Sequence, residues 1–120
     1  MRSPDNLYDL LDVTESRPGM YLGSESFSAL VGYIEGFCAA RMAYRLPEDE
    51  TPPWHAFSQW VTEQSNARTG SHRSGVTWVA YIRESSEGDD TRALALFFQL
   101  LHEYRGNLPD PPAIATARRA

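Results

Sequence analysis

Residues 90–105 read DTRALALFFQLLHEYR, and their apolar pattern decides the fold. Large apolar side chains recur there every three or four residues, which is the spacing of one face of an α-helix. They are Leu94, Phe97, Phe98, Leu101 and Tyr104. Asp89 or Asp90 is placed to cap this helix, and Gly106 is placed to end it. The stretch predicts an amphipathic helix whose apolar face needs other helices to cover it.

Three earlier segments show the same helical spacing. The first predicts a helix that ends near Ser16, the second a helix over about 25–45, and the third a helix over about 53–67. Within the second of these, Gly32 and Gly36 lie four residues apart. Each glycine costs about 1 kcal/mol of helix propensity. We expect the close approach of another helix to compensate, and the alternative is a ligand that lies over the glycine face.

Residues 76–84 are rich in apolar side chains and fit both the helical and the strand pattern. We favour a helix, because a single strand would have no partner among helices. The expectation is an all-α protein, built as a compact bundle of about five helices. Residues 1–106 are expected to form a single helical domain. Residues 107–120 contain three prolines and little periodic apolar content, so a flexible C-terminal tail is expected there.

The composition excludes several classes of function. The 120 residues carry 16 acidic and 11 basic side chains, a net charge of −5, so a general nucleic-acid binder is not expected. Cys38 is the only cysteine, which rules out an internal disulfide and a cysteine-based zinc site. No apolar run approaches the roughly 18 residues of a membrane span, and the first residues lack an apolar signal-peptide core. We expect a cytoplasmic protein with no membrane partner.

The residue types that carry catalysis show no recognisable spacing. The three histidines lack metal-ligand partners at helical spacing, and there is no lysine for a phosphate-binding loop. Cys38 falls in the middle of an apolar helix face, where a small core residue is the simplest interpretation. No catalytic residue, metal ligand or cofactor is therefore predicted, and an enzymatic role is less expected than a binding role.

Two short acidic runs and the aromatic residues point to a different kind of site. Glu48, Asp49 and Glu50 form one run, and Asp89 and Asp90 form the other. The simplest interpretation is that these are solvated turns and helix-start charges, whereas the functional one is an acidic face for a basic protein. Aromatic residues outside the core would serve as anchors on such a face, and Trp54 is the candidate beside the first run.

Residues 17–23, RPGMYLG, are expected to form an ordered loop in which Gly19 and Gly23 adopt angles closed to other residues. The segment resembles the RPGMYIG motif of the ATPase domain of gyrase B subunits. In that family the next helix carries a catalytic Glu and, four residues on, a magnesium-binding Asn. Here Glu35 is followed by Ala39, and the adenine-binding segment is missing. The resemblance implies a shared way to leave one helix and enter the next.

A longer resemblance is to a family of small uncharacterised bacterial proteins. It rests on RPGMYLG and on the segments 30–33, 54–60 and 97–104. The size and acidity are similar to those of immunity proteins, which implies a non-enzymatic domain that occludes a basic toxin or defence component. The alternative is a small-molecule-binding or enzymatic domain with a pocket between residues 17–23 and the second helix, where Arg17, Tyr21 and Glu35 supply the polar groups. A homodimer is a third hypothesis.

Overall fold

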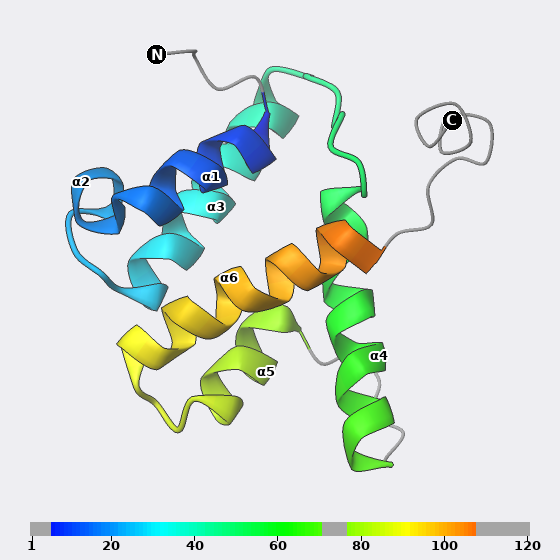
Figure 1. Ribbon diagram of the computed structural model, residues 1–120. Coiled ribbons are helices and arrows are strands. Elements are labelled where there is room, and N and C mark those ends of the chain that lie inside the picture. The colour runs from blue at the N-terminus through cyan, green and yellow to red at the C-terminus, as the bar shows by residue number, and fades with distance from the viewer. Residues whose placement is uncertain (1–5, 71–76, 108–120) are drawn as a thin grey trace, which may run out of the picture.

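The computed structural model describes residues 6–70 and 77–107 of the chain (Figure 1). In these residues there are six α-helices, one short 3-10 helix and no strand. The elements are α1 (Leu7–Ser16), α2 (Pro18–Leu22), α3 (Phe27–Ala43), η1 (Trp54–Ala56), α4 (Phe57–Thr69), α5 (Trp78–Ser85) and α6 (Asp90–Asn107). The predicted all-α class is confirmed. Residues 108–120, where a flexible tail is expected, lie outside the described residues.

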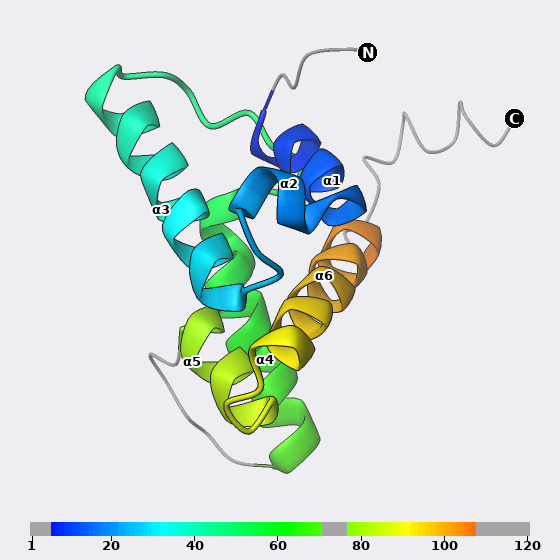
Figure 2. The ribbon, with the colours of Figure 1, turned by 90° about the vertical axis from the view of Figure 1, so that its left-hand side faces the viewer.

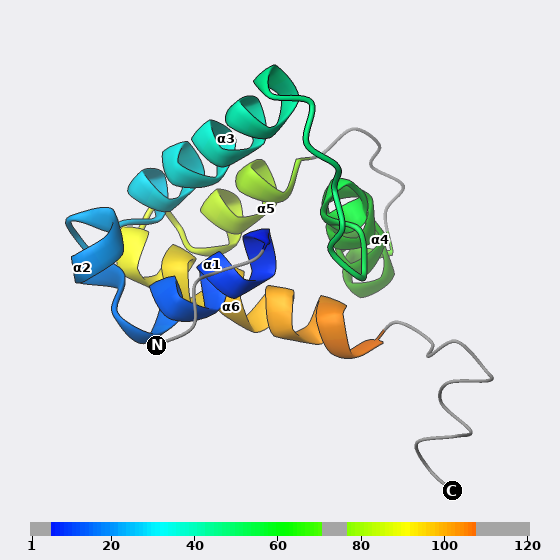
Figure 3. The same cartoon turned by 90° about the horizontal axis from the view of Figure 1, so that it is seen from above.

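Helix α6 runs through the middle of the bundle and contacts α3, α4 and α5 (Figures 1 and 3). Every residue of its predicted apolar stripe is buried, as Leu94, Phe97, Phe98, Leu101 and Tyr104 show. Ala93 and Leu100 are buried too, so the covered face is wider than one stripe. This width follows from the position of α6, because helices pack against it from more than one side.

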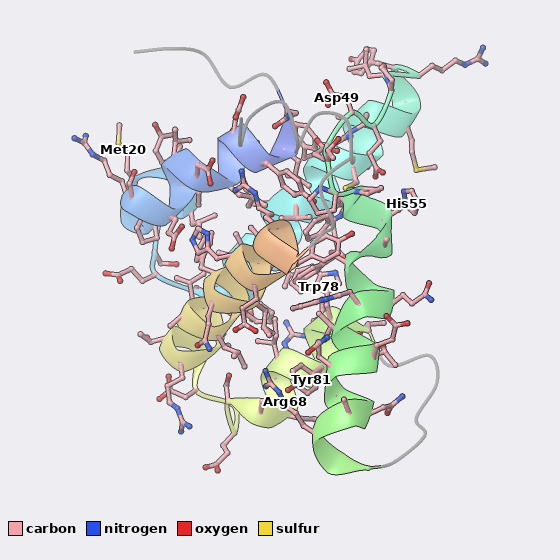
Figure 4. All side chains as sticks on the ribbon, turned by 45° about the vertical axis from the view of Figure 1, so that its right-hand side comes forward. Met20, Asp49, His55, Arg68, Trp78 and Tyr81 are labelled. Carbon is pink, nitrogen blue, oxygen red and sulfur yellow. The ribbon has the colours of Figure 1, made fainter. Side chains whose placement is uncertain are left out.

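Aromatic rings fill the space between η1, α4, α5 and α6. The ring centroid of Phe57 lies 5.9 Å from that of Phe97 and 5.4 Å from that of Tyr104. The centroid of Trp78 lies 5.2 Å from that of Phe97, and Trp54 stacks on Phe57 at 5.1 Å. These are the separations of favourable aromatic pairs. Trp78 points into this cluster from α5 in Figure 4, and all five side chains belong to the core.

The segment 17–23 differs from its expected form, because it contains the short helix α2 in place of a loop (Figure 2). Pro18 lies in the first turn, where a missing N–H breaks no hydrogen bond. Gly23 ends the helix with φ at 78°, a left-handed conformation that glycine adopts without strain. The same expectation is wrong for Gly19, which lies inside the helix and has no positive φ. No residue of α2 is buried, and Met20 is exposed. Pro18 therefore begins this short helix, and Gly23 ends it.

Where the two patterns compete, the chain forms helix α5 (Trp78–Ser85), as favoured from the sequence, and residue 76 lies outside the described residues. The Thr77 hydroxyl accepts a hydrogen bond from the backbone N–H of Ala80 at 3.1 Å and so caps the helix. Ser26 begins α3 in the same way, through the backbone N–H of Ala29. Asn6 begins α1 by accepting from the backbone N–H of Asp9. Polar caps thus fix the beginnings of three helices.

The expected close approach of a helix to Gly32 and Gly36 is wrong. Both residues are exposed, and a Cβ atom added at either would meet nothing within 4 Å. Helix α3 buries side chains only in its first half, with Ile34 as the last of them. Its second half, residues 35–43, is exposed or half-buried. Helix α3 therefore extends beyond the core, and its end is available to the surroundings.

Replacement of Phe97 tests the central position of α6. We expect Phe97→Ala to lower the free energy of unfolding by about 3–5 kcal/mol, because it leaves a large cavity among four aromatic rings. Urea denaturation measures this change. Gln99→Ala, at an exposed position of the same helix, serves as the control and should stay within about 0.5 kcal/mol of the wild type. Equal effects of the two substitutions would contradict the packing described here.

Candidate interaction surface at the end of α3

A buried carboxylate fixes the connector, residues 44–53, that joins α3 to η1. The side chain of Glu50 is fully buried. Its Oε1 and Oε2 accept hydrogen bonds from Nη1 and Nη2 of Arg41 at 2.7 and 2.9 Å. Oε2 also accepts from the backbone N–H of Leu7 at 2.8 Å. One side chain therefore joins the connector to the end of α3 and to the first turn of α1.

The charges of this pair stabilise each other. Burial by itself raises the pKa of the Glu50 carboxyl group, but the Arg41 hydrogen bonds and the Leu7 N–H outweigh it, so the pKa lies below its usual range. The Glu50 hydrogen bond likewise raises the pKa of Arg41. Both groups are therefore charged at neutral pH. The bidentate geometry is the strong form of an arginine–carboxylate contact, which suits a buried position.

Two tyrosines hold the proline pair of the connector. The Tyr8 hydroxyl, from α1, donates a hydrogen bond to the carbonyl oxygen of Pro52. The Tyr104 hydroxyl, from α6, donates to the carbonyl oxygen of Pro53 at 2.7 Å. Burial raises the pKa of both phenols, so they remain protonated donors at neutral pH. The guanidinium carbon of Arg105 lies 4.6 Å from the centre of the Tyr8 ring. The connector is thereby attached to both α1 and α6.

Beside the contacts that anchor the connector lies an exposed apolar patch, which we define as Met42, Tyr44 and Leu46. Their exposed fractions are 80%, 77% and 60%. Among the described residues the only other large apolar side chain this exposed is Met20, which lies on α2 far from this corner in Figure 4. Exposed large apolar side chains that occur together are candidates for an interaction surface, and these three follow one another closely at and just after the end of α3.

The turn that carries the patch has a defined geometry. Arg45 has φ at 55°, in the left-handed region, so the chain reverses immediately after Tyr44. The backbone N–H of Leu46 donates to the carbonyl oxygen of Arg41 at 2.9 Å, and that of Arg45 donates to the carbonyl oxygen of Met42 at 3.1 Å. Such paired hydrogen bonds close the end of a helix. The patch is therefore presented by a closed turn rather than by an open loop.

A hollow of about 290 Å³ lies next to the patch, between the end of α3 and the connector. Most of its wall is apolar or aromatic, from Phe37, Ala40, Tyr44, Leu46 and Pro47. Its polar groups come from Asn6, Arg41, Asp49 and Glu50. The guanidinium carbon of Arg41 lies 4.7 Å from the centre of the Phe37 ring. The hollow thus combines apolar walls with the hydrogen-bonded Arg41–Glu50 pair and the exposed Asp49.

Glu48 and Asp49 lie on the surface beside the patch, as expected for the first acidic run. Both are exposed, and Glu48 Oε2 lies 2.6 Å from Nδ1 of the exposed His55. Figure 4 shows Asp49 at the end of α3 and His55 at the beginning of η1. The acidic surface is therefore adjacent to the apolar patch, although the two were not connected in the sequence-based prediction.

Two other candidate interaction residues need correction. Glu50 was expected on the acidic face with its neighbours, but it is buried and holds Arg41. Trp54 was expected as an exposed anchor, but it is 9% exposed and its ring stacks on Phe57 in the core. Neither is available to a partner. Tyr44 and Leu46, which precede the acidic run in the sequence, are the exposed large side chains beside it.

The second acidic run lies at a different place. Asp89 Oδ1 accepts from the backbone N–H of Arg92 at 3.0 Å and so caps α6. Asp90 accepts a hydrogen bond from the hydroxyl of Ser26, which joins the beginnings of α6 and α3. Both are at the start of α6, whereas Tyr104 near its other end contacts the connector (Figure 1). The two runs therefore do not form one face.

The residues of the alternative pocket are not gathered in any hollow described here. Glu35 is exposed and lines a hollow of about 620 Å³ between α3 and α5. A third hollow, of about 410 Å³, includes Pro18 and residues of α6. Arg17 and Tyr21 line none of these three hollows. Gly19 and Gly23 are exposed, with open space around both.

Cys38 also lines the hollow between α3 and α5. Burial raises the pKa of its thiol, which disfavours the thiolate needed for nucleophilic chemistry. In residues 6–70 and 77–107, no group of three or more His, Cys, Asp or Glu side chains is arranged to hold a metal ion. Within the same residues no helix has the length and apolar character required to cross a membrane.

Compared with profiles of known protein families, with curated proteins and with solved structures, the chain matches none.

Replacement of Glu50 tests the anchor of the connector. We expect Glu50→Gln to lower the free energy of unfolding by about 3 kcal/mol, because it leaves the Arg41 guanidinium in a buried place without its counter-charge. Glu48→Gln removes the same charge at an exposed position and is the matched control. Thermal or urea denaturation measures both. A loss of the same size in both variants, or in neither, would show that the Arg41–Glu50 pair does not anchor the connector.

The pH dependence of stability gives a second test. Because the pKa of Glu50 is lower in the folded protein than the roughly 4.3 of a free glutamate, its contribution is present above that value. We expect the difference in unfolding free energy between wild type and Glu50→Gln to decrease as the pH falls below about 4.3. Denaturation at pH 7 and at several lower pH values measures it. A difference that grows on acidification would contradict the assignment.

Proposed function

We propose that the chain is a non-enzymatic protein-binding domain that docks on a basic face of another protein through Met42, Tyr44 and Leu46. The exposed apolar patch on an anchored turn is the observation that carries the proposal. In this mode of action the domain covers its partner's surface and so blocks it. That is how an immunity-type protein would occlude a toxin or a defence component.

The patch has the features of an interface centre. Tyrosine and methionine are enriched at interface cores, and tyrosine is among the residues that most often dominate binding energy. The contacts of Glu50, Tyr8 and Tyr104 hold the connector in place before any partner arrives. A surface that is ordered in advance loses less conformational entropy on binding. The contacts that anchor the connector therefore contribute to affinity as well as to stability.

The charge around the patch supports a basic partner. Glu48 and Asp49 are exposed beside it, and of the described arginines next to the patch in the sequence only Arg45 is exposed. The whole chain has a net charge of −5. Surface carboxylates of this kind speed the encounter with a basic protein and orient it, while apolar contacts supply most of the affinity. The association rate should therefore fall as the salt concentration rises.

Capture from a lysate of the source organism tests this function. We expect the wild-type chain to retain a specific protein, whose binding is then measured with purified components by calorimetry. Tyr44→Ser with Leu46→Ser should weaken that binding by about tenfold or more, because two exposed anchors are removed. Met20→Ser, at an equally exposed methionine on α2, is the control and should bind like the wild type.

Two outcomes would contradict the proposal. The first is that the double variant and the wild type retain the same protein with equal affinity, which would place the interface elsewhere. The second is that light scattering finds a concentration-dependent dimer of the wild type that Tyr44→Ser with Leu46→Ser abolishes. The patch would then be covered by a second copy of the chain.

A further inference from the structure

We infer that the hollow beside the apolar patch accepts a basic side chain of the partner, an arginine in preference to a lysine. This inference rests on the proposed protein-binding function and names the chemical group that the site recognises. It is carried by the wall of the hollow and by the balance of charge among the groups that line it.

The wall suits a long side chain with an apolar stem. Phe37, Ala40, Leu46 and Pro47 contribute apolar surface, and the exposed Tyr44 contributes an aromatic one. The stem of an arginine or a lysine packs on such surfaces while its charged end stays near polar groups. An extended basic side chain therefore matches both the apolar wall and the charged groups of the hollow.

The charge balance within the hollow selects a cation. Among the described residues, three charged groups line it, namely Arg41, Asp49 and Glu50. Arg41 and Glu50 neutralise each other, since both terminal nitrogens of the guanidinium donate to the carboxylate. Asp49 remains, and no cationic side chain of residues 6–70 and 77–107 lies within 4.0 Å of its carboxylate. The described groups thus leave one negative charge for a ligand to match.

Other occupants fit this arrangement less well. An apolar side chain would remove water from the Asp49 carboxylate without offering a hydrogen bond, which is unfavourable. An acidic side chain or a phosphate would be repelled by the same carboxylate, and the Arg41 guanidinium is already paired with Glu50. Of these groups, only one with an apolar stem and a cationic end is stabilised both by packing on the wall and by the charge of Asp49.

Arginine is preferred because of the geometry of its head group. A guanidinium is planar, stacks on aromatic rings and donates two parallel hydrogen bonds to one carboxylate, whereas an ammonium ion does neither. The hollow already contains this combination, since Arg41 lies over the Phe37 ring and binds Glu50 through two nitrogens. Tyr44 and Asp49, which also line the hollow, supply a second ring and a second carboxylate that a guanidinium of the partner would use in the same way.

Titration with a model compound tests the inference. The probe is N-acetyl-arginine amide, and backbone amide shifts of the 120-residue chain are followed by NMR. We expect saturable shifts centred on Ala40, Tyr44, Leu46 and Asp49. N-acetyl-citrulline amide has nearly the same shape without the charge, so it should bind about tenfold more weakly or not at all. N-acetyl-lysine amide should bind more weakly than the arginine compound.

Asp49→Asn is the decisive variant, and it should weaken arginine amide binding by about tenfold, because one charge-assisted hydrogen-bond partner is lost. Glu25→Gln, another exposed carboxylate, is the matched control and should leave binding unchanged. Asp49 is exposed, so the variant should unfold at the same temperature as the wild type. No saturable shift in the wild type, equal binding of citrulline or lysine amide, or an unchanged affinity in Asp49→Asn would overturn the inference.

The same variant separates this inference from the proposed function. If a protein partner is bound through Tyr44 and Leu46 but Asp49→Asn binds it as tightly as the wild type, the function stands and the inference fails. If arginine amide binds as expected but no protein depends on the patch, the hollow is a guanidinium site and the proposed function fails.

Discussion

The burial of the Glu50 carboxylate is the constraint on which the candidate site depends. A charged group fully removed from water is tolerated only when its hydrogen bonds are made, and here they come from Arg41 of α3 and from the first turn of α1. These contacts hold the connector against α1 and α3. They also neutralise Arg41, which leaves Asp49 as the uncompensated charge of the neighbouring hollow. The attachment of the connector to α1 and α3 and the charge balance of the hollow therefore both depend on this one carboxylate.

The helical core was predictable because its signal is periodic. In α6 the apolar residues at intervals of three and four all became buried, and α5 was correctly favoured as a helix over a strand. The exceptions are places where the periodic signal stops. Residues 17–23 hold a proline and two glycines, and they form the one short helix, α2, that the pattern did not predict. Gly32 and Gly36 signal a close contact in many helices, but here Gly32 lies on an exposed side of α3 and Gly36 lies beyond its last buried residue, Ile34.

The candidate site was only partly predictable, because it depends on contacts between segments far apart in the sequence. Glu48, Asp49 and Glu50 are chemically alike and adjacent, yet only Glu50 meets Arg41 and Leu7. Nothing local distinguishes it from its neighbours. Trp54 follows a proline pair in a polar connector, which resembles an exposed anchor, but Phe57 and Phe97 draw it into the core. Tyr44 and Leu46 flank Arg45, whose left-handed conformation is not predicted by any sequence pattern. Their exposure is therefore evident only from the fold.

The attachment of the connector to both α1 and α6 has a consequence for local dynamics. Glu50 holds the first backbone N–H of α1, Tyr8 holds Pro52, and Tyr104 near the end of α6 holds Pro53. Helix ends normally fray independently of one another, with opening free energies near zero. Here the first turn of α1, the last turns of α6 and the connector share hydrogen bonds, so they should open as one cooperative unit. Amide hydrogen exchange at these three separate stretches of chain would then report a single common opening.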